Sequence, residues 1–509
     1  MQTHLPHLSL PVVGTVNLQR RGPGAAIKPP PLTRTIKLAY GVGSMAEALV
    51  FSSLAQFLLL FYNQVRGLDA GKVGMAIAAG LIVNAVADPV VGSWSDRTRS
   101  RWGRRHPFMY AAILPLALSF YALFNPPSGM SEYGQLAWLA LFNILLQQAL
   151  TAFHTPHLAF GGELSTSYIE RTTVMSYNTF FLWAGDTLCW LSTFGLFFAA
   201  TRSFPNGALD PSRYGPFSIT VALLIVAILF TSSFFTRSRI PFVPKADAAA
   251  FTLGNLLIDV RQALANRNYV MLLLGAFFLS LMQGVRGGLW IYTATYYWGL
   301  TNAQIVWFAL GSFIAYVFGS AIVSGLHRRF DKRTTGAVAV AVYCIGPAIP
   351  LMLGNMGVLT SHTTGLLPIL IAFALLQHLP YSLMTTTVLS AFADIADENE
   401  LRFGARQQGI LYSTQTFFSR IDQAVGAALA GWTLTLIAFP VHAVPGHVSR
   451  SALSGLAFAF ILSTIPGLLT AFFYGRLRLT RATHAATREA LQRAASERHP
   501  NPHPGCDRG

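Results

Sequence analysis

Charged residues are scarce in this chain. Only 11% of its 509 residues are Asp, Glu, Lys or Arg, whereas soluble domains average about 25%. Hydrophobic residues make up 53% of the chain, so there is too little polar surface to cover a protein of this size in water. This deficit excludes an ordinary soluble protein and indicates that lipid surrounds much of the chain.

Cysteine and catalytic motifs are scarce as well. The three cysteines, Cys189, Cys344 and Cys506, are odd in number and fit no metal or disulfide spacing, so we interpret them as free thiols. No Walker motif, nucleophile elbow or HExxH sequence is present. ATP-driven transport and membrane hydrolase chemistry therefore lack support, and we predict no enzyme activity, no metal site and no cofactor.

Long apolar segments recur along the whole chain. Each is long enough to cross about 30 Å of hydrocarbon, which takes about 20 helical residues. They predict an all-α polytopic membrane protein with twelve transmembrane helices. The predicted spans are 36–64, 70–95, 107–126, 134–160, 173–200, 215–236, 269–298, 303–326, 336–353, 364–390, 409–439 and 452–475.

The polar segments divide these spans into two groups of six. We predict a basic disordered arm, a first six-helix bundle, a central loop, a second six-helix bundle and a basic tail, at 1–35, 36–236, 237–268, 269–475 and 476–509. Six plus six helices around a long central loop is the layout of major facilitator transporters, which bind their cargo between the two halves near the midplane.

The net charge of +16 has two readings, a nucleic-acid partner or a membrane surface. Most of the 36 Lys and Arg residues fall in the loops on one side of the predicted bundle, together with both ends of the chain. The positive-inside rule then places both termini in the cytoplasm. We therefore predict a monomeric protein of the bacterial inner membrane, with the lipid bilayer and no nucleic acid as its partner.

Ionisable side chains inside predicted spans are candidates for function, because each costs about 2.5–3.5 kcal/mol at the centre of a membrane. Asp88 precedes Pro89, which frees a backbone carbonyl one turn earlier, so this carboxylate is a candidate for binding a proton or a small cation. A structural ion pair with a neighbouring helix is the alternative. The other acids in spans are Glu47, a candidate for lining the polar cavity, and Asp186 and Asp422, whose roles the sequence leaves open.

Two arginines also fall within spans. Arg420 is a candidate for lining a cavity and neutralising a carboxylate of the other half, with a snorkelling or buried structural pair as the alternative. It points to a different helix face from Asp422. Arg286 lies in the glycine-rich run GVRGG, where either a break in the helix with close backbone approach or simple packing is expected.

The loop after the second span carries a dense set of charges. Asp96 is followed by Arg97, Arg104 and Arg105, with further arginines between them. We predict that these residues form a latch between the two bundles on the cytoplasmic side. Topological charge alone is the alternative.

Some aromatic and histidine side chains also fit a cavity. His154 and His157 have no further ligands at metal spacing, so we interpret them as polar lining. Sugar stacking or anchoring at the membrane interface is expected of a set of aromatic residues: Trp183, Tyr292, Tyr296, Trp290 and Trp298.

Four stretches of the chain resemble a known family. They are LAYGVGS from Leu38, ADPVVGSWSDRTRSRWGRRHPF from Ala87, GGELSTSYIERT from Gly161 and ADIADENELRFGARQQGILYSTQTFFSR from Ala393. These stretches resemble the glycoside–pentoside–hexuronide:cation symporters of the major facilitator superfamily, which include the melibiose carrier. The resemblance spans about 36–475 and implies alternating access, with sugar and cation bound between the bundles.

The resemblance also assigns roles to single positions. Asp88 matches the cation-binding carboxylate, and Asn84 stands where the melibiose carrier has a second one, which favours a proton over sodium as the coupling ion. Arg420 matches a cavity lysine, while Glu47, His154 and Thr416 complete the expected substrate lining. The acidic stretches of the resemblance add three members to the expected gate: Glu163, Asp394 and Asp397.

These features predict a secondary active transporter that couples a proton or sodium gradient to uptake of a sugar or glycoside. The same fold carrying a lysolipid or another amphiphile is one alternative. A membrane sensor that transports nothing is an alternative of another class, and it would need a signalling domain that the short polar termini do not provide.

Overall fold

The computed structural model describes residues 30–165, 168–201, 204–243, 264–403 and 408–480, with isolated positions elsewhere. The predicted arm, central loop and tail therefore lie mostly outside the described residues. So do the side chains of three residues predicted to be functional, Asp96, Arg97 and Thr416, although their backbones belong to helices.

The described residues form helices and no strands. The first half contains α1 Arg34–Ser53, α2 Ala70–Arg97, α3 His106–Phe124, α4 Glu132–Glu163, α5 Tyr168–Ser192 and α6 Tyr214–Thr236. The second half contains α8 Arg267–Tyr292, α9 Asn302–Arg329, α10 Lys332–Ile345, α11 Ala348–Asn355, α12 Leu366–Phe403, α13 Gln408–Leu436, α14 Arg450–Leu462 and α15 Thr464–Gly475.

These helices confirm the predicted fold class. Eleven helical segments of the described part are long and apolar enough to cross a membrane, and α13, with 29 residues, is long enough for a twelfth crossing. The pairs α10–α11 and α14–α15 each form one interrupted crossing. Pro347 lies at the first interruption and Ser463 at the second.

The structure extends one helix beyond its predicted span and excludes one open alternative. The acidic stretch with Asp394 and Asp397 is the last part of the 38-residue helix α12 and not a loop, because its Glu, Leu and Ala residues favour helix. The run GVRGG does not break its helix, since α8 continues from Arg267 to Tyr292. In lipid an unbroken helix keeps every backbone hydrogen bond.

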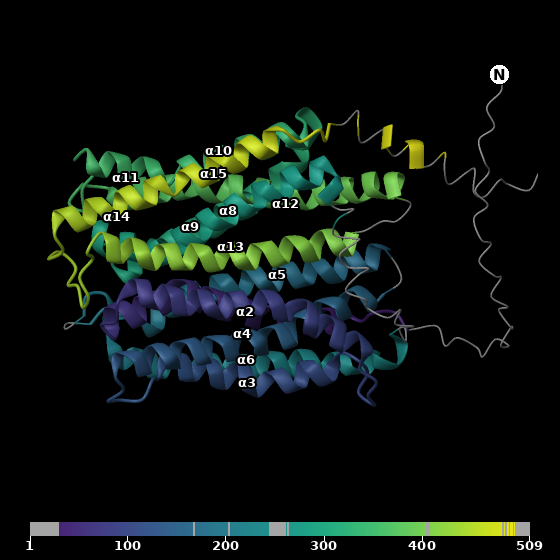
Figure 1. Cartoon of the computed structure of the whole chain (residues 1–509), viewed down its shortest axis with the longest axis horizontal. Coiled ribbons are helices and arrows are strands. Elements are labelled where there is room, and N and C mark those ends of the chain that lie inside the picture. The colour runs from purple at the N-terminus through teal and green to yellow at the C-terminus, as the bar shows by residue number, and fades with distance from the viewer. Residues whose placement is uncertain are drawn as a thin grey trace, which may run out of the picture.

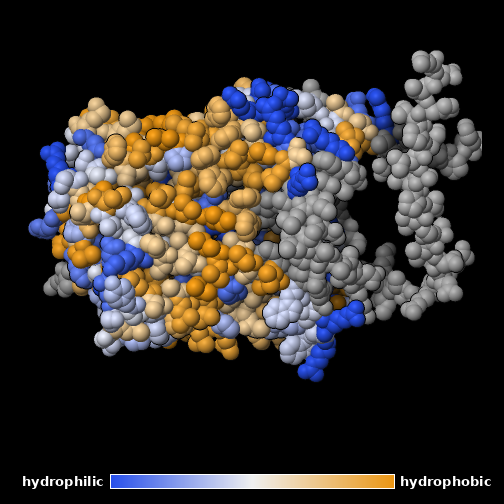
Figure 2. Space-filling model, in the orientation of Figure 1, coloured by the Kyte–Doolittle hydropathy of each residue, from blue (hydrophilic) through white to orange (hydrophobic). Residues whose placement is uncertain are grey.

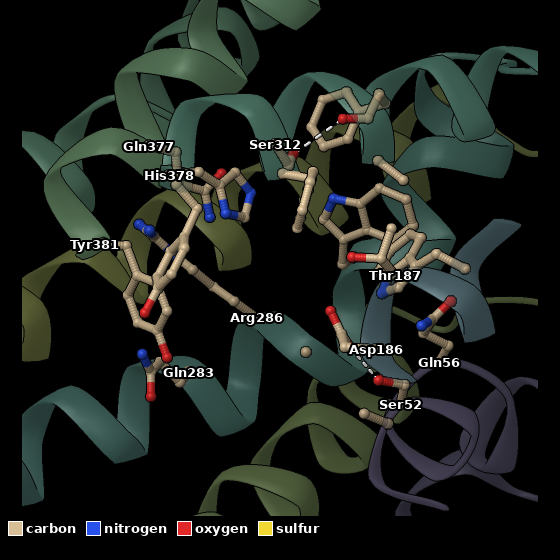
Figure 3. Close-up of a pocket in the computed structure, with 18 of the residues that line it drawn as sticks. Ser52, Gln56, Asp186, Thr187, Gln283, Arg286, Ser312, Gln377, His378 and Tyr381 are labelled. Atoms are coloured by element: carbon tan, nitrogen blue, oxygen red, sulfur yellow. Dashed lines mark hydrogen bonds between the residues drawn. The ribbon is translucent and has the colours of Figure 1, made fainter. Parts of the chain in front are cut away.

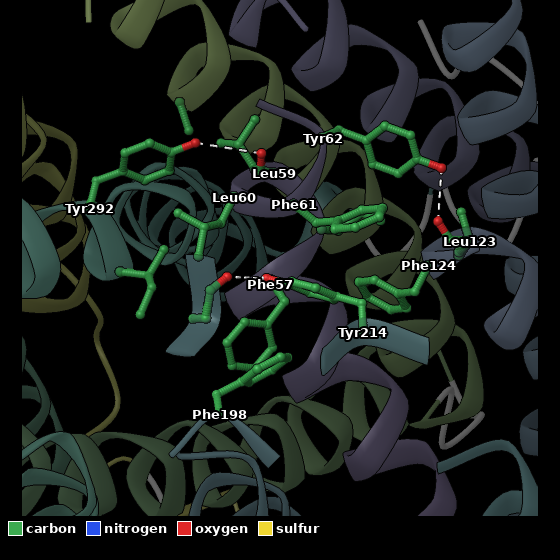
Figure 4. Packing of buried hydrophobic residues seen from close by; sticks show 14 of the residues in the cluster. Phe57, Leu59, Leu60, Phe61, Tyr62, Leu123, Phe124, Phe198, Tyr214 and Tyr292 are labelled. Atoms are coloured by element: carbon green, nitrogen blue, oxygen red, sulfur yellow. Dashed lines mark hydrogen bonds between the residues drawn. The ribbon is translucent and has the colours of Figure 1, made fainter. Parts of the chain in front are cut away.

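Aromatic packing fixes the end of the first helix. α1 continues through two π-helical turns, Leu54–Leu58 and Phe61–Val65, whose aromatic side chains Phe57, Phe61 and Tyr62 pack in the hydrophobic core (Figure 4). The ring of Phe61 lies 4.5 Å from that of Tyr214, and the Tyr62 hydroxyl donates to the carbonyl of Leu123 at 2.8 Å.

The helices lie roughly side by side along the long axis of the molecule, with the first half below the second in the view of Figure 1. An apolar band crosses the middle of the surface and hydrophilic residues gather at both ends (Figure 2). Large apolar side chains such as Leu118, Leu223 and Phe318 are each more than 60% exposed. Such a band matches a bilayer surrounding the helices.

Candidate ion-coupling and substrate sites

The two halves are tied together at the end of the bundle opposite the termini. Gln64, in the last π-helical turn that follows α1, donates to the carbonyl of Pro440 at 3.0 Å and accepts from the Tyr296 hydroxyl at 3.1 Å and from the amide of Ala443 at 2.8 Å. The Tyr292 hydroxyl donates to the neighbouring Asn63 at 2.9 Å. The conformation described is therefore closed at this end. Tyr292 and Tyr296 serve in this closure.

A cavity of about 360 Å³ lies between the halves. At about 30 Å³ per water molecule it has room for roughly 12 waters, which is the scale of a mono- or disaccharide. Aromatic rings from both halves line it: Trp183 packs 3.9 Å from Tyr316, and Trp190 packs 5.0 Å from Trp290. Trp183 and Trp290 thus occupy the position expected of sugar-stacking residues.

Polar groups face each other across this cavity (Figure 3). Asp186 of α5 accepts a hydrogen bond from Ser52 of α1 on the side of the first half. The second half presents a larger polar set from α8 and α12, namely Gln283, Arg286, Gln377, His378 and Tyr381. Carboxylate, amide and phenol groups beside aromatic rings suit the hydroxyl groups and apolar faces of a sugar.

Arg286 fastens the two interrupted helices to α8. It is 5% exposed and donates to the carbonyl of Cys344 at 2.8 Å, to Ser463 at 3.1 Å and to Thr464 at 2.8 Å. Cys344 is in α10, and the other two residues lie where α14 meets α15. Arg286 therefore holds the wall of the cavity in place. Gly284 of the same run allows a close backbone approach to Gly426 of α13, so packing and close approach occur together in an unbroken helix.

A second polar cluster joins α2 of the first half to α13 of the second. Nε of Arg420 lies 3.7 Å from Oδ2 of Asp88, and the two side chains are 11% and 19% exposed. The Arg420 guanidinium also lies 5.0 Å from the ring centre of Phe51. The carboxylate of the other half that Arg420 was expected to neutralise is thus Asp88.

The hydroxyl of Thr151 completes the surroundings of Asp88. Its oxygen lies 2.5 Å from Oδ1 of Asp88 and 2.5 Å from Oδ1 of Asn84. Thr151 is on α4, and Asn84 is one turn before Asp88 on α2 with no exposed surface. The predicted pair of coupling residues therefore shares one hydroxyl, whose importance the sequence did not indicate.

Glu47 and His154 form a third contact beside this cluster. Nδ1 of His154 lies 2.7 Å from Oε2 of Glu47, and both side chains interact electrostatically with Arg420. His157, one turn along α4, instead stacks on Tyr40 at 4.4 Å. Of the two histidines, His154 thus belongs to the ionic cluster and His157 to the packing of the first half.

The residues predicted as a gate form ion pairs within each half. Oε1 of Glu163 lies 2.6 Å from Nη2 of Arg104 and 2.8 Å from Nη2 of Arg105. In the second half, Nζ of Lys332 lies 2.6 Å from Oδ2 of Asp394. Each pair joins the segment that follows the second or eighth crossing, which in the second half is the first residue of α10, to the end of the fourth or tenth crossing, so a similar contact recurs in both halves.

A family model described as MFS/sugar transport protein matches residues 39–481 of the chain. The chain belongs to this family. It is 27% identical over 471 residues to the putative glycoside/cation symporter YagG of Escherichia coli (strain K12), which covers 91% of this chain and 95% of that protein. It is 22% identical over 434 residues to the isoprimeverose transporter of Lactiplantibacillus pentosus, covering 85% of each chain. The predicted family resemblance is confirmed.

A solved structure supports the fold of this member of the sugar transport family. The inward open conformation of the xylose transporter XylE from Escherichia coli superimposes with a TM-score of 0.55 at 15% identity, covering 90% of this chain and 98% of that one. At that identity the match establishes the major facilitator fold alone.

Sequence reasoning missed most of the large cavity of this family member. It weighed Trp183 and Trp290, left Asp186 and Arg286 without a role, and did not consider the polar side chains of α12, including Gln377 and His378. One feature of the sequence could have indicated them. The predicted span 364–390, now α12, contains glutamine, histidine and tyrosine close together, and such polar residues are unusual in a helix that faces lipid.

Proposed function

We propose that the protein is a proton-coupled symporter that carries a sugar or glycoside across the bacterial inner membrane, with both termini in the cytoplasm. The observation that carries the proposal is the ion pair of Asp88 with Arg420, because it joins the two halves that must move during alternating access. At an effective dielectric constant near 20, two charges 3.7 Å apart attract by about 4 kcal/mol before desolvation is subtracted.

Protonation of Asp88 would remove this attraction. Arg420 would then be released from α2, and the balance between the two orientations of the halves would change. A ligand can shift such a balance only by binding one state more tightly. The ion pair gives the proton a different affinity for the two conformations, and the cavity between the halves does the same for the sugar.

The surroundings of Asp88 favour a proton over sodium as the coupling ion. An ionised Asp88 can accept from Thr151 while the amide nitrogen of Asn84 donates to the same hydroxyl. A protonated Asp88 can instead donate to Thr151, which then donates to the Asn84 oxygen. Both protonation states are satisfied by a simple flip of the Asn84 amide, whereas a sodium ion would meet a single carboxylate already paired with an arginine.

The cavity favours a sugar over an amphiphile. A lysolipid carrier would need an apolar lateral opening with few polar groups, but this cavity brings Asp186, Gln283 and Gln377 together with aromatic rings. The names of the relatives, a glycoside/cation symporter and an isoprimeverose transporter, point to the same class of cargo. Membership of a transport family leaves the sensor hypothesis without support.

The gate remains part of this proposal. The pairs of Glu163 with Arg104 and Arg105, and of Lys332 with Asp394, hold the loops of each half in shape. We assign Asp96 and Arg97 to contacts between the halves when the cytoplasmic end closes, and Asp397 to the matching surface of the second half.

The decisive experiment is uptake of a sugar panel into proteoliposomes under imposed proton or sodium gradients. We expect accumulation to follow the proton gradient and Asp88→Asn to abolish it. Glu132→Gln, which alters an exposed ion pair with Lys72 at the closed end, is the matched control and should accumulate sugar normally. Accumulation driven by sodium alone would refute proton coupling, and accumulation that survives Asp88→Asn would refute the role of that carboxylate.

A further inference from the structure

A smaller cavity adjoins the large one inside the second half. Its volume is about 60 Å³. The two cavities share part of their wall, formed by Trp290, Phe308, Gln377 and Phe460. Because the same side chains line both cavities, only these side chains separate a molecule in the large cavity from the smaller cavity.

The lining of the smaller cavity, which we call the side pocket, is almost wholly apolar. Apart from the shared wall and Trp298, its main contributors are Pro347, Pro350, Leu351, Leu370, Phe373 and Ala374. Leu351, Leu370 and Ala374 are 3%, 5% and 2% exposed, so they face the interior and not the lipid.

An interrupted helix creates the space. α10 ends at Ile345 and α11 begins at Ala348, with Pro347 between them. Proline cannot continue the hydrogen-bond ladder of a helix, so the ninth crossing bends here. Small Ala374 of α12 faces the bend across the side pocket.

The size and chemistry of the side pocket indicate its occupant. At about 30 Å³ per water it has room for roughly two waters, which is the scale of a ring or a short alkyl group. Water would find few hydrogen-bond partners there, since Thr293 and Gln377 are the polar residues in its lining. An apolar group flanked by Trp290 and Trp298 would be stabilised instead by burial and ring contacts.

We propose that the side pocket is a binding subsite for the apolar aglycone of a glycoside whose sugar occupies the large cavity. The inference rests on the proposed function, because it takes the large cavity to be the sugar site. It narrows the cargo from sugars in general to glycosides with an aryl or short alkyl group. The shared wall of Trp290, Phe308 and Phe460 would open toward the side pocket when such a group enters.

The test compares matched glycosides on the purified full-length protein. The probes are the methyl and phenyl β-D-glucopyranosides, β-D-galactopyranosides and β-D-xylopyranosides, with binding followed by tryptophan fluorescence and by competition in proteoliposome uptake. For any sugar whose methyl glycoside binds, we expect the phenyl glycoside to bind about tenfold tighter or more. Equal affinities for the methyl and phenyl glycosides of the same sugar would overturn the subsite.

Filling the side pocket provides a second readout. Ala374→Met is expected to bring the ratio of phenyl to methyl affinity close to one. Leu376→Met, two residues along α12 at a side chain that is 50% exposed, is the control and should keep the wild-type ratio. An unchanged ratio in Ala374→Met would place the aglycone elsewhere and refute the subsite.

The outcomes separate this inference from the proposed function. If no methyl or phenyl glycoside of the panel binds or is transported, the sugar-transport proposal itself fails. If lysophosphatidylcholine competes for the site and phenyl glycosides do not, the side pocket serves an acyl chain and the aglycone subsite is refuted. Sugar transport without a phenyl preference refutes the subsite alone.

Discussion

Several charged residues inside the bundle lie against a partner from a distant part of the chain. Asp88 lies beside Arg420, His154 beside Glu47, and Arg286 beside the junctions of two interrupted crossings. Removing one member of a buried ion pair costs about 3–5 kcal/mol, because the other charge is left uncompensated in a poor solvent. The effect of substituting one of these residues on stability therefore depends on whether its partner is still present.

The pair of Asp88 and Arg420 can be tested by a double-mutant cycle on stability. Arg420→Gln alone and Asp88→Asn alone should each lower the thermal unfolding midpoint in detergent, because each leaves one buried charge. The double variant should be more stable than the sum of the two losses predicts. The midpoint is measured from intrinsic fluorescence, and strictly additive losses would show that the two charges do not interact.

At the scale of elements, α13 is the helix on which the two halves meet. It packs against α2 through Gly74 and Gly431, and against α8 through Gly284 and Gly426. A Cβ atom on Gly284 would lie 2.9 Å from the Cα of Gly426, and one on Gly74 would lie 2.9 Å from the carbonyl oxygen of Ala427. Backbones approach this closely only where glycine removes the side chain.

Gly431 offers a test of the closed end. A Cβ atom there would collide with the carbonyl oxygen of Ala70 on α2, so Gly431→Val should separate α13 from α2 and favour the conformation open at the end opposite the termini. We expect a cysteine introduced by Asn63→Cys to react faster with a membrane-impermeant maleimide in this background than in the Asn63→Cys protein that keeps Gly431.

The control for this test is Gly325→Ala on α9. A Cβ atom on Gly325 would have no atom within 4 Å, so the labelling rate at position 63 should equal that of the Asn63→Cys protein alone. A rate in Gly431→Val that also equals that of the Asn63→Cys protein would show that α2 and α13 do not control closure.

At the scale of the whole molecule, two six-helix halves enclose a cavity and meet at one end. The closing contacts of Gln64 and Asn63 lie at the end opposite the termini. With the termini in the cytoplasm, as the distribution of Lys and Arg predicts, this closed end is the periplasmic one. The conformation described would then hold the cavity apart from the outside medium.

The cysteines allow the orientation to be measured on the otherwise unaltered protein. Cys189 and Cys344 are buried free thiols, and Cys506 belongs to the basic tail of the sequence. An impermeant maleimide should label inside-out vesicles and leave right-side-out vesicles unlabelled, and Cys506→Ser should abolish the labelling. Labelling of right-side-out vesicles at Cys506 would place the tail in the periplasm.

The sequence alone determined the membrane location, the twelve crossings and the family, because hydropathy and motifs are properties of neighbouring residues. It also identified Asp88 and Arg420 as candidates, since a charge within an apolar segment stands out against its neighbours. Their pairing, the role of Thr151, and the cavity lined by α5, α8 and α12 depend on how helices far apart in the chain pack together. Only the tertiary structure decided these, because a helix fixes the direction of a side chain but not the helix that it will face.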